Sequence, residues 1–381
     1  MLRICAATIF AAMLAGSASA AGTYDRGNSH EPSSLDPHKT SSVNEAHILR
    51  DLFEGLVMPD AAARVIPGAA KSWTVSDDGT VYTFTLRDDA RWSNGDLVTA
   101  EDFVYSFRRL ENPDTAAAYA SMLYVVKNAE EVNAGKAKPE EIAVKAIDAR
   151  SLEITLKAPT PYFLELLTHQ ATYPVHRTSV ENLGANWQKP GNLVSNGAFT
   201  LTEWVPHDHI TITRNPRFRE TANVTLDSVI YYPTDDRSTA MKRFETGDLE
   251  SNDDIPTEQL ADLRKTFGNQ IHVGAYLGIY YYTFKLDKAP WNDVRLRRAI
   301  SMAIDRDFLA EKIWSGSMFP AFGMVPPVIE TYQSYRATYA DLLGIYRDKC
   351  AELFSTEPVQ LAEDVDLGYI RAQNIQIDVD T

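Results

Sequence analysis

Cysteine is scarce in this chain of 381 residues, which contains only Cys5 and Cys350. Cys5 lies in an N-terminal segment that we expect to be removed, so the mature chain would keep a single thiol. One thiol cannot form a disulfide within the chain. Burial of apolar side chains must therefore provide the stability of the fold.

Basic residues are also few, since the chain has 37 Lys and Arg but 52 Asp and Glu, which gives a formal net charge of -15. Such a surface repels nucleic-acid phosphates and anionic lipids. We therefore expect no nucleic-acid partner.

An apolar stretch near the N-terminus is too short to anchor the protein in a membrane. Residues 4–15 follow the positive charge of Arg3 and precede the small residues 16–20. This order, ending in Ala18-Ser19-Ala20, is typical of a cleaved Sec signal peptide. No cysteine for lipid attachment follows it. We therefore predict a free protein in the periplasm, with a mature chain that begins at Ala21.

Several sequence signals of enzymes are absent. The chain has no G-x-x-x-x-G-K, G-x-G-x-x-G, G-x-S-x-G or H-E-x-x-H motif, so nucleotide binding, serine hydrolysis and zinc proteolysis lack support. His207 and His209 would share one face of a strand, but the turn around them offers no third ligand, which favours a solvated turn over a metal site. The same interpretation applies to the paired aspartates at 77–78, 88–89, 235–236 and 253–254. We expect no cofactor, no metal and no enzymatic activity.

Length and patterning indicate a mixed α/β protein with at least two lobes, since single cores rarely grow beyond about 250–300 residues. Apolar spacing predicts a helix over residues 46–57, and Thr99 with Asp102 predicts a capping box that starts a helix carrying Phe103 to Leu110. Further helices are expected to stop at Gly247, to follow a cap at 292–293, and to end at 315–316. Alternating residues predict strands over 81–86 and 152–156, a hairpin over 199–212, and strands over 229–232 and 276–284.

Three consecutive tyrosines, Tyr280 to Tyr282, lie in the last of these predicted strands. Side chains alternate across a strand, so rings would point to both faces. One face should pack into a core, and the other would either pack as well or line a binding cleft. The residues alone leave this choice open.

A series of motifs is spread over residues 22–327. They are EPSSLDPHK (31–39), RDLFEGL (50–56), PGAAKSW (67–73), YTFTLR (82–87), ARWSNG (90–95), TAEDFVYS (99–106), PGNLVSNG (190–197), the tyrosines at 280–282 and NDVRLR (292–297). In this order they resemble the periplasmic oligopeptide-binding proteins of ATP-driven importers, in the peptide- and nickel-binding solute-binding family 5.

This resemblance implies a two-lobed α/β fold of the periplasmic-binding-protein type, cluster C. Its expected parts are a signal peptide (1–20), lobe I (21–65 and 190–285), a small domain attached to lobe I (66–189) and a partial lobe II (286–381). Relatives continue far past this length, and the pattern fades from Val328 although residues 342–353 could still form a helix. The resemblance therefore implies a truncated or frame-altered chain whose second lobe is incomplete.

The resemblance also implies a function and a site. Lobes of this family close over an extended peptide held mainly by its backbone, with side chains in hydrated pockets, so affinity depends little on peptide sequence. The implied partners are an oligopeptide and an inner-membrane ABC permease with its ATPase, and the implied state is a monomer. Position by position, the resemblance assigns peptide contacts to Glu31, Ser33, Tyr119, Asn252, Asp253 and Tyr281. Alternatives are a carrier of nickel, haem or another small solute, and an exported hydrolase.

Overall fold

The structure is a computed structural model, and it describes residues 22–274 and 278–326. It divides into two compact units, Met1–Ile255 and Pro256–Thr381. The predicted signal peptide, both cysteines and the predicted helix within 342–353 lie outside the described residues. The predicted lobe boundaries stay predictions.

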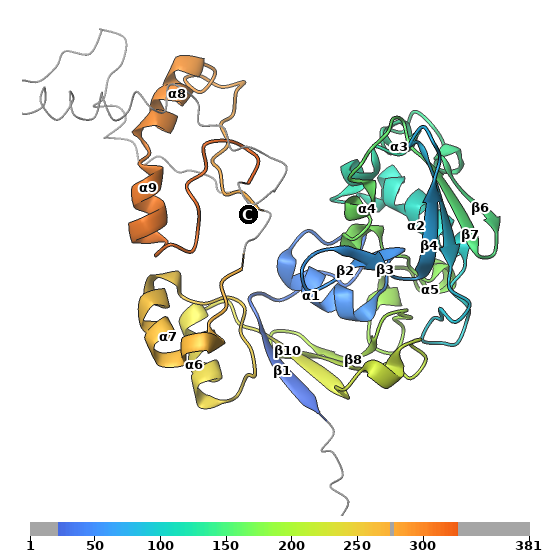
Figure 1. Cartoon of the computed structure of the whole chain (residues 1–381), viewed down its shortest axis with the longest axis horizontal. Coiled ribbons are helices and arrows are strands. Elements are labelled where there is room, and N and C mark those ends of the chain that lie inside the picture. Colours follow the sequence, from blue (N-terminus) through green and yellow to red (C-terminus); the bar gives the residue numbers. More distant parts are fainter. Residues whose placement is uncertain (1–21, 275–277, 327–381) are drawn as a thin grey trace, which may run out of the picture. The chain divides into compact units, whose positions relative to one another are not determined.

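The first unit contains a four-stranded sheet built from distant parts of the chain (Figure 1). Its order is β1 (Thr23–Asn28), β10 (Ser228–Pro233), β9 (His209–Arg214) and β8 (Phe199–Val205). β1 runs parallel to β10, whereas β9 is antiparallel to both β10 and β8. Strands β1, β8 and β10 therefore run in the same direction. The predicted hairpin and the predicted strand at 229–232 are confirmed.

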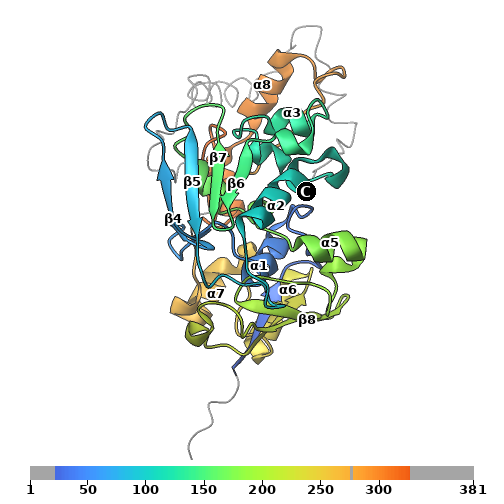
Figure 2. The same ribbon diagram turned by 90° about the vertical axis from the view of Figure 1, so that its right-hand side faces the viewer.

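A second, antiparallel sheet of the same unit has the order β4 (Ala70–Val75), β5 (Val81–Leu86), β7 (Ser151–Thr155) and β6 (Val144–Asp148). Tyr82, Phe84 and Leu86 of β5 are buried, as their alternation predicts. Helix α2 (Ala100–Glu111) packs against β6 and β7, and Figure 2 shows it beside this sheet. The predicted capping box of α2 is confirmed, since the Thr99 amide donates to Asp102 Oδ2 at 2.7 Å.

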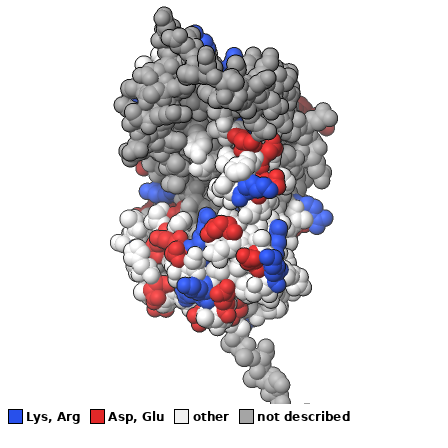
Figure 3. Space-filling model, turned by 90° about the vertical axis from the view of Figure 1, so that its left-hand side faces the viewer, with Lys and Arg blue, Asp and Glu red and all other residues white. Residues whose placement is uncertain are grey.

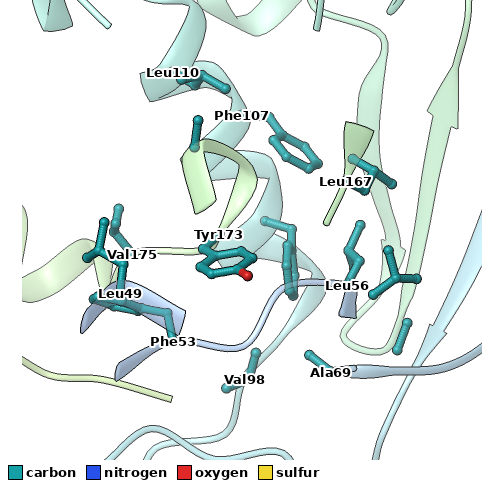
Figure 4. Close-up of a cluster of buried hydrophobic side chains, with 14 of the residues drawn as sticks. Leu49, Phe53, Leu56, Ala69, Val98, Phe107, Leu110, Leu167, Tyr173 and Val175 are labelled. Carbon is teal, nitrogen blue, oxygen red and sulfur yellow. The ribbon is translucent and has the colours of Figure 1, made fainter. Parts of the chain in front are cut away.

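Helix α1 (Val43–Leu52) begins earlier and ends earlier than the sequence predicts. Its start is fixed by Ser42 and Glu45, which form a capping box. Beyond its end, Phe53 and Leu56 lie outside the helix yet are buried, so their apolar spacing reflects the core rather than a longer helix. Figure 4 shows these side chains around the ring of Tyr173, together with residues of α2. One core thus joins α1 to the α2 region.

The first unit contains further strands and α-helices. They are β2 (Val57–Pro59), β3 (Val65–Pro67), α3 (Ala129–Asn133), α4 (Phe163–Leu166), α5 (Arg177–Leu183) and α6 (Arg237–Thr246). Helix α6 stops at Gly247, whose φ of 81° is the left-handed conformation that the sequence predicts there.

The second unit contains α7 (Leu260–Phe267), α8 (Val294–Ala303) and α9 (Arg306–Phe308), which continues as a π-helical turn, Leu309–Ile313. Asp293 caps α8 as predicted, because its Oδ1 accepts from the Arg295 amide at 2.8 Å. The predicted strand over 276–284 is wrong for residues 278–284, which form no strand. A strand needs a neighbour for its main-chain hydrogen bonds, and within the described part of the chain none pairs with this segment. No helix of the described residues is long and apolar enough to cross a membrane.

Candidate functional site

The carboxyl ends of β1, β8 and β10 lie at one edge of the first sheet, here called the carboxyl edge. Ligands of open α/β sheets commonly bind outside the carboxyl ends of parallel strands. Glu31 and Ser33 follow β1 at this edge. Ser251 pairs in parallel with Arg26 of β1, so Asn252 and Asp253 reach the same edge.

Glu31 is tied to the hairpin of β8 and β9. Its Oε1 accepts a hydrogen bond from Trp204 Nε1 at 2.7 Å, and its Oε2 accepts from the His207 amide at 3.3 Å. The ammonium group of Lys189 lies 4.9 Å from the centre of the Trp204 ring. Each carboxylate oxygen of Glu31 therefore already has a partner within the protein.

Ser33 is held by Glu45, the third residue of α1. Glu45 Oε1 accepts from the Ser33 amide at 2.9 Å and from Ser33 Oγ at 2.5 Å. Glu45 Oε2 accepts from the amides of Ser41 and Ser42, both at 3.1 Å, and from Ser42 Oγ at 2.8 Å. Burial alone would raise the pKa of Glu45, but the hydrogen bonds from Ser33 and Ser42 hold it below its usual value.

Tyr119 reaches the same segment from the region after α2. Its hydroxyl donates to the main-chain oxygen of Ser41 at 3.2 Å, and its ring meets His169 edge-on, with centroids 4.6 Å apart. Burial, with a smaller effect of Arg50, lowers the pKa of His169 to about 4, so this imidazole is neutral at pH 7. The structure thus brings Ser33 and Tyr119 together around Ser41 and Glu45.

Asn252 and Asp253 are fixed beside β1. The carboxylate of Asp253 lies 3.0 Å from His47 Nδ1 and 3.4 Å from Arg26 Nη2. Burial alone would raise the pKa of Asp253, but these two neighbours hold it below its usual value. Asn252 packs on Gly27 so closely that a Cβ at residue 27 would lie 2.5 Å from its Oδ1.

Tyr281 belongs to the second unit, whereas the other five predicted site residues belong to the first. Tyr280, Tyr281 and Tyr282 are 56%, 55% and 45% exposed. The rings of Tyr280 and Tyr282 meet edge-on at 5.7 Å. None of the three side chains is buried, so the prediction that one face of this segment packs into a core is wrong. A role of Tyr281 in a site stays a prediction.

Of the two histidines, His207 lies in the exposed turn between β8 and β9, whereas His209 is the first residue of β9 and is partly buried. His207 adopts a φ of 62°, and the two ring nitrogens of His209 lie 2.9 Å from Asp208 and 3.2 Å from Glu203. Both carboxylates can accept hydrogen bonds from the protonated ring, first Asp208 and then Glu203, and this raises the pKa of His209. In residues 22–274 and 278–326, no group of three or more His, Cys, Asp or Glu could hold a metal ion. On the described part of the face shown in Figure 3, acidic and basic side chains are interspersed.

Sequence reasoning missed Glu45, Trp204 and His47, which hold the predicted residues in place. For Glu45 a signal existed, because Ser42 and Glu45 have the S-x-x-E spacing of a capping box. Trp204 and His47 carry no such local signal, since their partners lie far away in the chain.

Comparison with known proteins identifies similar chains. The family model for bacterial extracellular solute-binding proteins, family 5 Middle, matches residues 64–362. The periplasmic oligopeptide-binding protein OppA of Escherichia coli (strain K12) is 40% identical over 337 residues. That alignment covers 84% of this chain and 62% of the relative, so the chain spans about three fifths of the relative's length.

Solved structures are similar too. The murein tripeptide-binding protein MppA of Escherichia coli superposes with a TM-score of 0.82 at 35% identity, covering 89% of this chain and 68% of that one. Haemophilus influenzae OppA, in complex with the peptide RPPGFSPFR, superposes with a TM-score of 0.81 at 36% identity, covering 88% and 66%. The expected α/β class, with the fold of two-lobed periplasmic peptide-binding proteins, is confirmed.

Proposed function

Because the chain belongs to the bacterial extracellular solute-binding proteins of family 5, we propose that it is the extracytoplasmic binding component of an ABC importer and that its solute is an oligopeptide. The observation that carries this proposal is the 40% identity to a protein named as oligopeptide-binding, over 84% of this chain. The similarity to a structure holding a nine-residue peptide supports it.

The geometry of the carboxyl edge is compatible with this function. Ser33 follows β1 there, Asn252 and Asp253 follow a residue that pairs with β1, and Tyr119 bonds Ser41 in the segment after Ser33. Each is held by neighbouring groups, which limits the freedom lost when a ligand binds. In the proposal these four residues, with Glu31 and Tyr281, contact the peptide. Contacts to its backbone would make binding tolerant of sequence.

The remaining parts of the proposal concern partners and location. The chain delivers its ligand as a monomer to an inner-membrane permease driven by an ATPase, and it catalyses no reaction. It is exported to the periplasm with cleavage after Ala20. The mass of protein recovered from the periplasm tests this last point, since a chain that retains Met1 would contradict it.

Calorimetric titration tests the function. The 381-residue chain is titrated with trialanine, with a tripeptide of mixed sequence and with free alanine as the matched control. Saturable binding of both tripeptides, without binding of alanine, is expected. Binding of nickel or haemin in place of both peptides would favour the other carriers of the family. Hydrolysis of a peptide or ester substrate would overturn the assignment as a carrier.

A further inference from the structure

We infer that Glu45 is a positioning residue of the proposed peptide site, which fixes both ends of the segment Ser33–Ser42 and thereby the places of Ser33 and Tyr119. The inference rests on the proposed function, because it concerns the same site. Glu45 itself need not touch the peptide.

The hydrogen bonds of Glu45 come from two places in the chain. One carboxylate oxygen accepts from the amide and hydroxyl of Ser33, and the other accepts from Ser41 and Ser42. Ser33 precedes Glu45 by 12 residues, so these bonds join the segment's start to its end. The side chain is buried, with 2% of the residue exposed. Hydrogen bonds to a buried charged acceptor are among the stronger ones in proteins.

Only an ionised carboxylate can serve both groups of donors. All five partners of Glu45 donate, and a carboxylate offers acceptors on both oxygens. Glutamine has nearly the same shape but carries an NH₂ group in place of one oxygen. Whichever way its amide turns, that NH₂ would face main-chain N–H groups that need an acceptor. Glu45→Gln should therefore release one end of the segment and leave the other bound.

Tyr119 is linked to Glu45 through a single residue. Glu45 accepts from the Ser41 amide, and the Ser41 carbonyl accepts from the Tyr119 hydroxyl. The position of Ser41 thus depends on both side chains. A change at Glu45 should alter the surroundings of Tyr119 although the two side chains share no direct hydrogen bond.

The middle of the segment has anchors of its own, so the variant should keep its fold. Gln188 Oε1 accepts from the Leu35 amide at 2.7 Å, and Asp36 Oδ1 accepts from the His38 amide at 3.1 Å. Arg109 holds the Asp36 carboxylate. These bonds do not involve Glu45, and they provide an internal reference for the experiment.

Asp102 offers a matched control, because it is the N3 residue of the capping box of α2 as Glu45 is of α1. Asp102→Asn should weaken a helix cap without releasing Ser33 or Ser41. The experiment measures tripeptide affinity of the unaltered chain, Glu45→Gln and Asp102→Asn by calorimetry, with melting temperatures. Residue-resolved hydrogen exchange follows the amides of residues 33–42 in the same proteins.

The expected result is a Kd raised roughly 5- to 30-fold in Glu45→Gln, with Asp102→Asn within about twofold of the unaltered chain. Exchange should accelerate at Ser33 or at Ser41 and Ser42, while Leu35 and His38 keep their protection. Tyr119→Phe provides a second test: its effect on Kd should be smaller in the Glu45→Gln background, because both changes act on Ser41.

The outcomes separate the two proposals. If the unaltered chain binds peptide and Glu45→Gln binds equally well, Glu45 is not a positioning residue. If both variants lose the same affinity in proportion to their melting temperatures, Glu45 is only a helix cap, and the inference is again overturned. If Glu45→Gln does not fold, Ser33→Ala, Tyr119→Phe and the double variant are compared instead. Two residues positioned by the same carboxylate should have coupled effects on Kd, so purely additive effects would overturn the inference. No peptide binding by the unaltered chain would overturn the proposed function, and this inference with it.

Discussion

Arg109 holds the buried carboxylate of Asp36 through both of its terminal nitrogens. Nη1 donates to Oδ1 at 2.9 Å and Nη2 donates to Oδ2 at 2.5 Å. Burial alone would raise the pKa of Asp36, but the hydrogen bonds from Arg109 hold it below its usual value. This pair connects α2 to the segment that follows β1.

Removing Arg109 should destabilise the fold strongly. Arg109→Met leaves the Asp36 carboxylate buried and unpaired, which we expect to lower the free energy of unfolding by about 3–5 kcal/mol. Urea denaturation measures this change, with the exposed Arg177→Met as control. Adding Asp36→Asn to Arg109→Met should recover part of the loss. A loss below about 1 kcal/mol in the single variant would contradict the assigned role.

Glu111 should make stability depend on pH. Both carboxylate oxygens are buried without a hydrogen-bond partner among the described residues, and burial raises the pKa to about 8 despite an opposing effect of Lys157. The folded chain therefore binds this proton more tightly than the unfolded chain, whose pKa is near 4.5. The contribution of Glu111 to the free energy of unfolding is most favourable below about pH 4.5. It becomes less favourable as the pH rises to about 8, and it is constant above that pH.

Glu111→Gln should remove this dependence. The free energy of unfolding of Glu111→Gln, relative to that of the unaltered chain, should rise between pH 5 and pH 8, by up to about 4 kcal/mol at pH 8. The half-exposed Glu131→Gln is the control and should leave the pH profile unchanged. Parallel profiles of the unaltered chain and Glu111→Gln would show that Glu111 does not titrate in this range.

Gly27 should be needed for the placement of Asn252. In Gly27→Ala the new Cβ would lie 2.5 Å from Asn252 Oδ1 and 3.3 Å from its Cα, so the segment at 252 must shift. We expect a several-fold weaker peptide affinity and a loss of stability of about 1–3 kcal/mol. Gly22→Ala, whose Cβ would meet its nearest atom at 3.6 Å, is the control and should change neither. Unchanged affinity in Gly27→Ala would remove Asn252 from the proposed site.

Tyr119 and Tyr281 should each contribute to peptide affinity. Replacing either by Ala ought to reduce the binding free energy by about 1–2 kcal/mol, with similar losses for peptides of unlike sequence, because the contact is to backbone. Calorimetry with two dissimilar tripeptides, alongside melting temperatures, measures both effects. A large drop in melting temperature with unchanged affinity would assign that tyrosine to the core.

Local chemistry determined which parts of the fold could be predicted. The cap of α2 at Thr99, the stop of α6 at Gly247 and the alternation in β5 depend on neighbours within a few residues. Strand β1 has no such signal, since Thr23–Asn28 is mostly polar and becomes a strand by pairing with β10. The aromatic segment at 278–284 shows the converse, because strand-forming residues make no strand without a neighbour.

In the candidate site, too, some residues could be predicted from sequence and others could not. Resemblance supplied Ser33 and Tyr119, and the structure places both at one segment. The groups that hold them could not be derived from sequence, because the Tyr119 hydroxyl bonds Ser41 across 78 residues and Trp204 bonds Glu31 across 173.

The pairing of β1 with β10 has a consequence for how the chain folds. Thr23 and Ser228 meet across 205 residues, so the first sheet cannot be completed until more than half of the chain is available. The second sheet, with strands between Ala70 and Thr155, can form earlier from more local contacts. During synthesis β1 therefore waits as an unpaired strand, and the late closure of its sheet should limit the folding rate.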